Sequence, residues 1–326
     1  MSSSHPKVMY FSHAGEDVYD LIRAAARPDF DVLTLKRDDD AERRHLIRDA
    51  DVVICAAYPL KQPFIEAAER LALVHHQGVG WQDTIDWSVL KQRGIPLALT
   101  PQGTSIGVAE HTVLLMLAAA KRLSFADSEL RQGRWHINAL RADSRELFGK
   151  TIGYIGMGRI AQAVAERLKS FGCAGVYYDP MVTIADDEMH RLGIAPASFD
   201  DTLAKADVLT IHVPLTAQTR HLIDRAAIAR MKPGAILVNT ARGGIVDDGA
   251  LADALRSGKL LAAGLDVFEQ EPPQKGNPLF TLPNVVLTPH ISAGSRDAMV
   301  QKMTAVFDNI RRFYRGEALA NRVSAW

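Results

Sequence analysis

The stretch Thr151-Ile-Gly-Tyr-Ile-Gly-Met-Gly-Arg-Ile-Ala161 decides the fold of this 326-residue chain. Its first five residues have the pattern of a buried strand, and residues 162–170 follow a helical pattern. Between them, Gly156 makes the tight turn and Gly158 lets the backbone approach a pyrophosphate. The small Ala161 lets the helix pack on the strand. A strand, a glycine-rich turn and a helix in this register predict a dinucleotide-binding unit.

Asp179 follows about 20 residues later, at the end of the next predicted strand. Its carboxylate can accept hydrogen bonds from the adenosine ribose hydroxyls and would repel a 2′-phosphate, and Pro180 supplies no cation to hold one. We therefore expect NAD in preference to NADP. The predicted contacts are Asp179 and the turn residues Gly156, Met157, Gly158, Arg159 and Ile160. A plain structural turn with a solvated aspartate is the alternative.

Short apolar runs alternate with helical patterns on both sides of this unit, which is typical of parallel sheets with helices on both faces. Five runs precede it, at 7–11, 30–35, 51–56, 71–75 and 96–100. Six belong to the series that it opens, at 151–155, 176–178, 207–211, 235–239, 261–265 and 285–287. Six strands make a Rossmann sheet. The sequence therefore predicts an α/β fold with two doubly wound parallel-sheet domains.

Two further segments complete the predicted domains. Residues 108–123 are a long apolar helix by pattern, which predicts burial between domains or subunits. Residues 295–315 are also helical by pattern and could return to the first sheet, making that domain discontinuous. We expect one domain of residues 1–101 plus 295–326 and a second of residues 102–294. The first part of the second domain, residues 103–150, would hold the interdomain helix and an arm.

Composition narrows the function classes. Lys plus Arg number 38 and Asp plus Glu number 38, so no net charge points to nucleic acid or an anionic membrane as a partner. No apolar run approaches the roughly 20 residues of a membrane span, and the N-terminus does not resemble a signal peptide. The two cysteines form neither a disulfide framework nor a metal site, and no histidine has acidic or thiol partners spaced for zinc. A cytoplasmic protein without a metal is expected.

Arg242, Glu271 and His290 carry the chemistry that the last third of the chain suggests. An imidazole titrates near ~6.5, close to neutral pH, and a neighbouring carboxylate stabilises its protonated form. A guanidinium can hold an α-keto acid through paired hydrogen bonds that a lysine cannot reproduce. Together they are the parts that a hydride-transferring enzyme needs.

The chain resembles the D-2-hydroxyacid dehydrogenase family over essentially its whole length. The glycine-rich turn is one matching motif. The others are Gly78-Val-Gly80 with Asp83-Thr-Ile-Asp86, Val108-Ala-Glu-His111, His212-Val-Pro-Leu-Thr216, the run from Met231 to Asp247, Gly264-Leu-Asp-Val-Phe268 with Glu271-Pro272, and Thr288-Pro-His290. The resemblance implies a flavodoxin-like substrate domain, a Rossmann NAD-binding domain, an active site in the cleft between them, and a homodimer formed through the NAD-binding domain. Residues 125–150 would be the arm that embraces the partner.

The resemblance also implies roles for particular residues. His290 would be the acid and base, Glu271 its carboxylate partner, and Arg242 the group that orients the substrate. The loop Gly78, Val79 and Gly80 would donate backbone N–H groups to the substrate carboxylate. Asp266 would contact the nicotinamide amide. The other implied cofactor contacts are Ser105, Pro214, Thr219, Thr240, Ala241, Arg242 and His290.

Substrate choice stays open at this level. The family accepts keto acids from glyoxylate and hydroxypyruvate to bulky or phosphorylated ones, and Trp81 after the glycine loop is a departure that puts a large ring near the expected pocket. We expect reduction of a small 2-keto acid, of the glyoxylate or hydroxypyruvate type, to the D-2-hydroxy acid by NADH. The alternative is an NAD-sensing corepressor or scaffold protein on the same fold.

Overall fold

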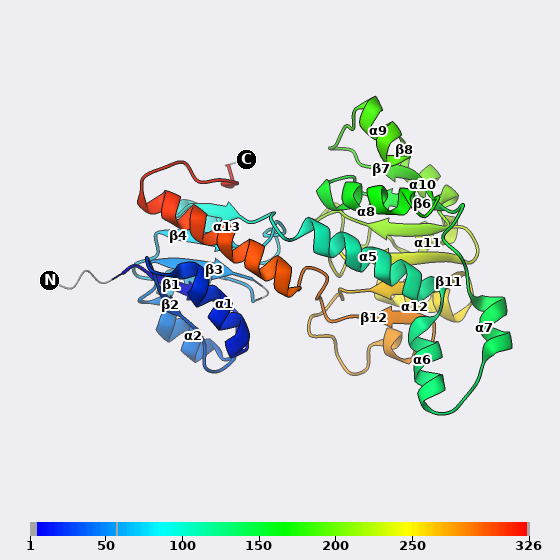
Figure 1. The fold of residues 1–326 in the computed structure, drawn as a ribbon, viewed down its shortest axis with the longest axis horizontal. Helices are drawn as coiled ribbons and strands as arrows, with labels where there is room; N and C mark the ends of the chain where they lie inside the picture. The colour runs from blue at the N-terminus through cyan, green and yellow to red at the C-terminus, as the bar shows by residue number, and fades with distance from the viewer. Residues whose placement is uncertain (1–4, 57, 325–326) are drawn as a thin grey trace. The chain divides into compact units, whose positions relative to one another are not determined.

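The computed structural model describes residues 5–56 and 58–324, and the chain divides into two compact units. Unit 1 comprises Met1–Thr104 and Gly294–Trp326, and unit 2 comprises Ser105–Ala293. The sequence placed the two borders at 101/102 and 294/295. Figure 1 shows both units as α/β layers.

Unit 1 is built on a five-stranded parallel sheet in the order β2-β1-β3-β4-β5, the flavodoxin-like order. The strands are β1 (Lys7–Tyr10), β2 (Asp31–Leu33), β3 (Val52–Cys55), β4 (Leu73–His76) and β5 (Leu97–Leu99). Every pair is parallel, as the alternation of apolar runs and helices predicted. All carboxyl ends therefore lie at one edge of the sheet, where ligands bind in open α/β folds.

Helices cover both faces of this sheet. α1 (Glu16–Ala26) and α13 (Arg296–Tyr314) share one core with β1, β3 and β4. α2 (Asp40–Ile47), α3 (Gln62–Ala67) and α4 (Trp87–Gln92) share the core on the other face. Ser295 starts α13 by accepting a hydrogen bond from the Ala298 amide at 3.0 Å. The chain thus returns to unit 1 after completing unit 2, and α13 packs against α1 (Figure 1).

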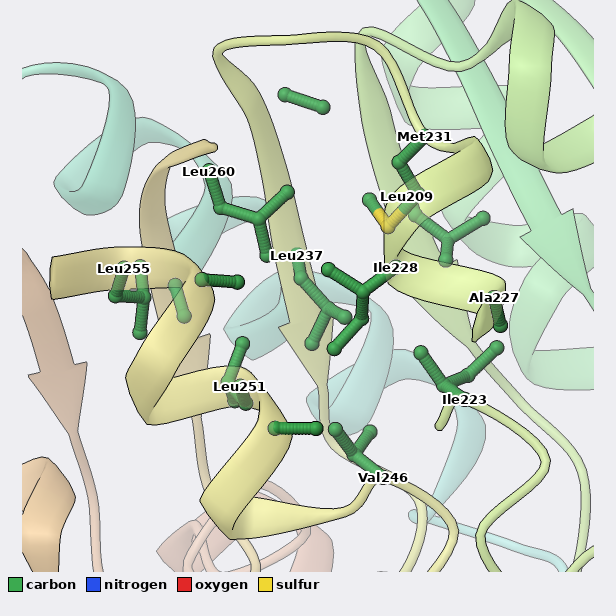
Figure 2. Packing of buried hydrophobic residues seen from close by; sticks show 14 of the residues in the cluster. Leu209, Ile223, Ala227, Ile228, Met231, Leu237, Val246, Leu251, Leu255 and Leu260 are labelled. Atoms are coloured by element: carbon green, nitrogen blue, oxygen red, sulfur yellow. The ribbon is translucent and has the colours of Figure 1, made fainter. Parts of the chain in front are cut away.

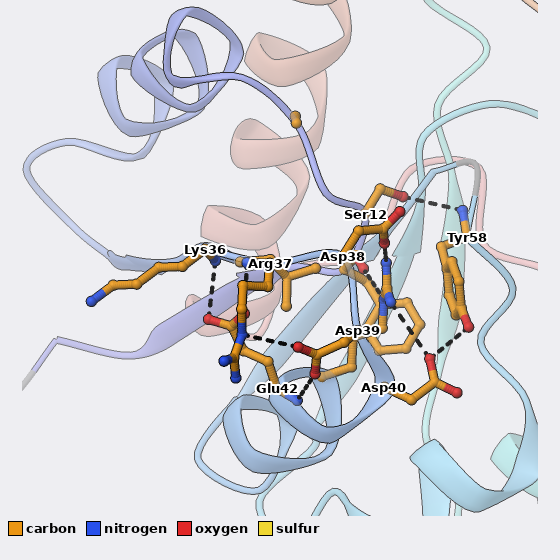
Figure 3. Close-up of polar contacts among 12 residues, drawn as sticks. Ser12, Lys36, Arg37, Asp38, Asp39, Asp40, Glu42 and Tyr58 are labelled. Carbon is orange, nitrogen blue, oxygen red and sulfur yellow. Dashed lines mark hydrogen bonds and ion pairs between the residues drawn. The ribbon is translucent and has the colours of Figure 1, made fainter.

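The buried Arg43 side chain contacts three loops at the edge of the unit 1 sheet where the carboxyl ends of the strands lie. The Arg43 guanidinium donates to the Phe11 carbonyl at 3.2 Å, pairs with Asp38, and lies 3.5 Å from the centre of the Tyr58 ring. The Tyr58 hydroxyl in turn donates to Asp40 at 2.6 Å (Figure 3). The loops after β1, β2 and β3 are therefore held in one polar network.

Unit 2 is built on a seven-stranded parallel sheet in the order β12-β11-β10-β9-β6-β7-β8. The strands are β6 (Thr151–Ile155), β7 (Ala174–Tyr178), β8 (Ile194–Pro196), β9 (Val208–Ile211), β10 (Ala235–Asn239), β11 (Leu260–Leu265) and β12 (Val285–Leu287). This is the Rossmann order with one strand added. The predicted count of six is wrong because β8 was missed. β8 is a three-residue edge strand with only Ile194 buried, so it has no apolar run to detect.

Two helical layers enclose this sheet. α10 (Phe199–Lys205), α11 (Arg225–Arg230), α12 (Asp248–Arg256) and the 3-10 helix η1 (Pro278–Thr281) pack on one face, where leucines and isoleucines from strands and helices interdigitate (Figure 2). α5 (Ser105–Ala120), α8 (Arg159–Lys169) and α9 (Asp186–Leu192) cover the other face. The sheet is therefore buried on both sides, as its apolar strands predict.

The long apolar helix ends earlier than predicted, and its expected burial between domains or subunits stays a prediction. α5 stops at Ala120 because Arg122 adopts a left-handed conformation with φ 53°, and α6 (Leu123–Arg131) and α7 (Ile137–Asp143) follow. The buried side of α5 packs on α8, β10 and β11. Its apolar character is thus explained by packing inside unit 2, while Leu114 on the same helix is 50% exposed.

Candidate active site

The three chemistry-bearing residues come from neighbouring strand ends of unit 2. Arg242 follows β10, Glu271 lies in the loop after β11, and His290 follows β12. β10, β11 and β12 are adjacent and parallel, so their carboxyl ends meet at one edge of the sheet. Residues that are far apart in sequence are brought to one place by this topology.

His290 and Glu271 form a direct pair. The imidazole Nδ1 lies 2.7 Å from Glu271 Oε2, and the other carboxylate oxygen accepts the Phe268 amide at 3.1 Å. Main-chain contacts hold the ring in place. The His290 amide donates to the Asp266 carbonyl at 2.7 Å, and its φ of 51° is a left-handed value that a non-glycine residue seldom adopts. Such held conformations cluster at functional sites.

The charge state of Glu271 follows from two opposing effects. Partial burial raises the pKa of the carboxyl. The hydrogen bond and charge of His290, the Phe268 amide and the charge of Arg242 outweigh that burial, so the pKa of Glu271 is lowered from its ordinary value. Glu271 is therefore a carboxylate at neutral pH and can balance a positive charge on the imidazole.

The Arg242 loop is shaped by Asn239 at the end of β10. The Asn239 side chain accepts from the Ala241 amide at 3.0 Å and donates to the Arg242 carbonyl at 2.9 Å, which closes a turn. Arg242 Nη1 donates to the Ala241 carbonyl at 2.8 Å. The charge of Arg242 acts on Glu271, as noted above, so all three residues belong to one electrostatic unit.

Asp266, fully buried, organises the segment that carries His290. It accepts from the Thr288 hydroxyl at 2.6 Å and from the amides of Ile291 at 2.9 Å and Ser292 at 2.8 Å. The Thr288 proton is used by Asp266, so Thr288 accepts from His111 Nε2 across 3.0 Å. The sequence did not single out His111 or Thr288 as supports, because their partners are 177 and 22 residues away along the chain. It did not single out Asn239 either, although its partners are two and three residues away. The nicotinamide contact expected of Asp266 stays a prediction.

The glycine-rich turn has the form that a dinucleotide needs. A Cβ on Gly156 would lie 2.8 Å from the His212 carbonyl oxygen, whereas a Cβ on Gly158 would meet nothing within 4 Å. Gly158 caps α8 with no side-chain hydrogen bond, so the first amides of the helix remain open to an anion. These observations fit a pyrophosphate beside Gly158, with Met157, Arg159 and Ile160 in the same turn.

Asp179 supports this turn. Its carboxylate accepts the Met157 amide at 2.8 Å and the Met181 amide at 2.8 Å. Oδ1 also accepts the Val182 amide at 3.1 Å, whereas Oδ2 accepts the Met157 amide and has a second lone pair that can accept from a hydroxyl group. The sequence predicted that Asp179 contacts the adenosine ribose. It could not predict the hydrogen bonds by which Asp179 supports the turn.

The remaining expected cofactor contacts lie in unit 2 in loops with defined hydrogen bonds. Thr240 pairs with Thr112 at 2.8 Å, and the Thr219 hydroxyl donates to the Pro214 carbonyl at 2.6 Å. Ser105 is the first residue of α5. The structure therefore describes the surroundings of these residues, and their contacts to a dinucleotide stay predictions.

The glycine loop expected to bind substrate lies in unit 1, after β4. The Gly78 carbonyl accepts from the Thr100 amide at 3.1 Å, and Val79 is 42% exposed. Trp81 packs against the unit 1 core and meets Trp87 edge to face, with the ring centres 6.0 Å apart. The bulky ring after the loop thus has a packing role of its own.

An apolar surface gathers on the segment between α5 and β6. Trp135 is 73% exposed, Phe148 75% and Leu130 56%. A hollow of about 460 Å³ lies in the same segment, lined by Lys121, Ala126, Glu129, Leu130, Arg134, Trp135, His136, Ile137, Leu140, Arg141 and Ser144. This segment is the predicted arm.

The described residues contain neither a candidate metal centre nor a candidate membrane-spanning helix. Within residues 5–56 and 58–324, no group of three or more His, Cys, Asp or Glu side chains is placed to hold a metal ion. Among the described helices, none is both long enough and apolar enough to cross a membrane.

Comparisons with known proteins identify relatives of this chain. The NAD binding domain model of the D-isomer specific 2-hydroxyacid dehydrogenase family matches residues 113–292. The D-3-phosphoglycerate dehydrogenase of Methanocaldococcus jannaschii is 44% identical over 280 residues, which is 85% of this chain and 52% of that protein. The hydroxypyruvate reductase of Thermotoga maritima is 42% identical over 260 residues, 79% of this chain and 82% of that protein.

The likeness extends to solved structures. The TT0316 protein from Thermus thermophilus has a TM-score of 0.85 and 32% identity, and the match covers 98% of this chain and 100% of that one. The chain spans about half the length of the phosphoglycerate dehydrogenases that it matches, 52% in the first case. The match to an NAD binding domain confirms the predicted cofactor. This chain belongs to the D-isomer specific 2-hydroxyacid dehydrogenase family.

Proposed function

We propose that the protein reduces a small 2-keto acid to the corresponding D-2-hydroxy acid with NADH. The observation that carries this proposal is the His290–Glu271 pair, 2.7 Å apart, beside Arg242 in the NAD-binding unit. NADH, when bound, supplies the hydride. The turn from Gly156 to Ile160 would hold its pyrophosphate, and Asp179 its adenosine ribose.

The protein side chains supply a proton and a fixed charge. His290, held by Glu271, would give its proton to the keto oxygen as the carbonyl carbon is reduced, and would take it back in the reverse direction. Arg242 would hold the substrate carboxylate and the carbonyl oxygen through its planar fork. Both act where negative charge develops, which is the effect that lowers a barrier most.

The substrate class is part of the proposal. Relatives are named for phosphoglycerate, hydroxypyruvate and glyoxylate, so glyoxylate and hydroxypyruvate head the candidates. A panel of 2-keto acids with NADH, followed at about 340 nm, tests the proposal. Turnover of at least one small keto acid is expected, and no turnover of any would refute it. The scaffold alternative has no observation in its favour, and the expected cytoplasmic location stays a prediction.

Glu271→Gln should move the falling limb of the pH–rate profile for keto-acid reduction to lower pH. Reduction needs the protonated ring, and Glu271 stabilises that form through its charge. The measurement is kcat/KM from about pH 5 to 9, with Glu188→Gln as the control because Glu188 is an ion-paired surface glutamate of the same unit. An unchanged profile would make Glu271 a structural residue only.

Asp179→Ser should narrow the preference for NADH over NADPH. The serine loses the carboxylate that accepts from ribose hydroxyls and also the charge that repels a 2′-phosphate. Loss of hydrogen bonds to a charged group, about 1.5–3 kcal/mol, predicts kcat/KM for NADH lower by roughly 10- to 100-fold. Efficient use of NADPH would need an added cation.

The comparison is kcat/KM for both cofactors in wild type and mutant. Asp187→Ser, an exposed aspartate of α9, is the matched control. Wild type should favour NADH. Equal wild-type efficiencies, or a ratio that the mutation leaves unaltered, would show that the Asp179 carboxylate only braces the turn.

We also propose that the protein is a homodimer joined through the arm of unit 2. Large exposed apolar side chains can mark protein–protein interfaces, and the arm exposes Trp135 and Leu130 in the lining of the hollow and Phe148 elsewhere on the same segment. Exposed tryptophans of this kind are frequent energetic anchors of interfaces.

Trp135→Ala should weaken the dimer by about 30-fold or more, because an anchor tryptophan contributes on the order of 2 kcal/mol. Sedimentation across a range of protein concentrations measures the dissociation constant. Met181→Ala, which removes an 84% exposed apolar side chain outside the hollow, should leave association unchanged. A wild-type protein that sediments as a monomer at every concentration would contradict this proposal.

A further inference from the structure

The Arg242 loop and the Glu271 loop touch main chain to main chain at Gly243. A Cβ on Gly243 would lie 1.7 Å from the Phe268 carbonyl oxygen and 2.0 Å from its carbon, so no side chain fits there. The spacing between the two loops is therefore set by direct contact of their backbones. This spacing holds only while both loops keep their shapes.

His221 lies in a third loop and bonds to both the Arg242 loop and the Glu271 loop. It lies in the loop after β9, and its amide donates to the Gly244 carbonyl at 2.7 Å. Two residues later, the Ile223 amide donates to the Ile245 carbonyl at 3.0 Å, so this loop runs beside the Arg242 loop. The His221 side chain pairs through Nε2 with the Glu269 carboxylate, which belongs to the Glu271 loop. One residue thus bonds to both loops.

Asp248, the first residue of α12, is a second acid near Glu269. Burial, and after it the negative charge of Glu269, raises the pKa of Asp248 to about 6. The bond that the structure shows for the Glu269 carboxylate, two residues before Glu271, is its ion pair with His221.

We propose that His221 and Glu269 form a positioning clamp that fixes the Glu271 loop against the Arg242 loop. The clamp acts through the loops: it keeps Glu271 aligned with His290 while Arg242 holds the substrate. It rests on the proposed function, because alignment matters only if His290 transfers a proton. Misplacement of about 1 Å by a mutation away from the chemistry can reduce a rate by roughly 100-fold.

Glu269→Ala tests the clamp, since it removes the carboxylate that His221 holds. We expect kcat for the best keto acid to fall by about 10- to 100-fold, with the dissociation constant of NADH unchanged. Glu269→Gln keeps an oxygen acceptor for His221 and should recover part of the rate. Glu188→Ala is the matched control: its side chain is 34% exposed against 38% for Glu269, and it is ion-paired in the same unit.

A double-mutant cycle separates positioning from general stability. In a Glu271→Gln background, Glu269→Ala should cost no more than about 2-fold, because the group that it positions is already gone. An equal loss in both backgrounds, or a loss that follows the melting temperature across all variants, would overturn the clamp.

An independent readout needs no substrate. The ring nitrogen shifts of His290 report whether Nδ1 is hydrogen-bonded, and Glu269→Ala should move them toward those of Glu271→Gln. If wild type turned over no keto acid, the proposed function would fail, and the nitrogen shifts would still decide the clamp. Shifts in Glu269→Ala identical to wild type would overturn it.

Discussion

His290→Ala should lower kcat for keto-acid reduction by about 10²–10⁴, the usual contribution of a positioned acid or base. NADH affinity should change little, because the expected dinucleotide contacts centre on the Gly156 turn and Asp179. Steady-state kinetics and a cofactor titration measure the two quantities. Retention of more than a tenth of the wild-type rate would remove His290 from the acid/base role.

The conformation of His290 calls for a second variant. Its φ of 51° strains an alanine, whereas asparagine tolerates the left-handed region. His290→Asn therefore keeps the backbone preference and loses the imidazole. Both variants should lose turnover to the same degree. A much more active asparagine variant would assign the loss in alanine to the backbone.

Arg242→Lys should reduce kcat/KM by about 10²–10³, although the positive charge is kept. The reason is geometric: a planar fork can hold the carboxylate and the keto oxygen at once, and an ammonium group cannot. The loop itself should persist, because Asn239 closes it through the main chain of residues 241 and 242.

Arg256→Lys is the control for this change, since Arg256 is a surface arginine of α12 paired with Asp253 at 3.4 Å. It should behave as wild type. Comparison of kcat/KM for one keto acid across the three proteins gives the answer. An Arg242→Lys enzyme within about fivefold of wild type would show that charge alone is used at this position.

Most of the fold could be predicted from patterns of neighbouring residues in the sequence. The turn at Gly156 and the strand before it are defined by residues next to one another, so the sequence located them to within a residue or two. β8 was missed because a short edge strand has little to bury. The end of α5 was misplaced because Arg122, a residue with good helix propensity, adopts a left-handed conformation.

The site was predicted less completely than the fold. Arg242, Glu271 and His290 could be named from residue types and from the family resemblance, and the structure brings them together. Their supports could not be named. Asp266 works through residues 288–292, and the Glu269 segment depends on His221, 48 residues away along the chain. Side chains that act through such long-range hydrogen bonds leave no periodic signal in a sequence.

Transfer of deuterium from NADH that carries deuterium at both positions of the reactive nicotinamide carbon tests the central claim most directly. With hydroxypyruvate as the first substrate, we predict one deuterium at C2 of the product and the D configuration only, because His290 as the acid and Arg242 as the group that holds the substrate would fix a single face of the keto acid. Formation of product without the label, or of the L product, would contradict the account.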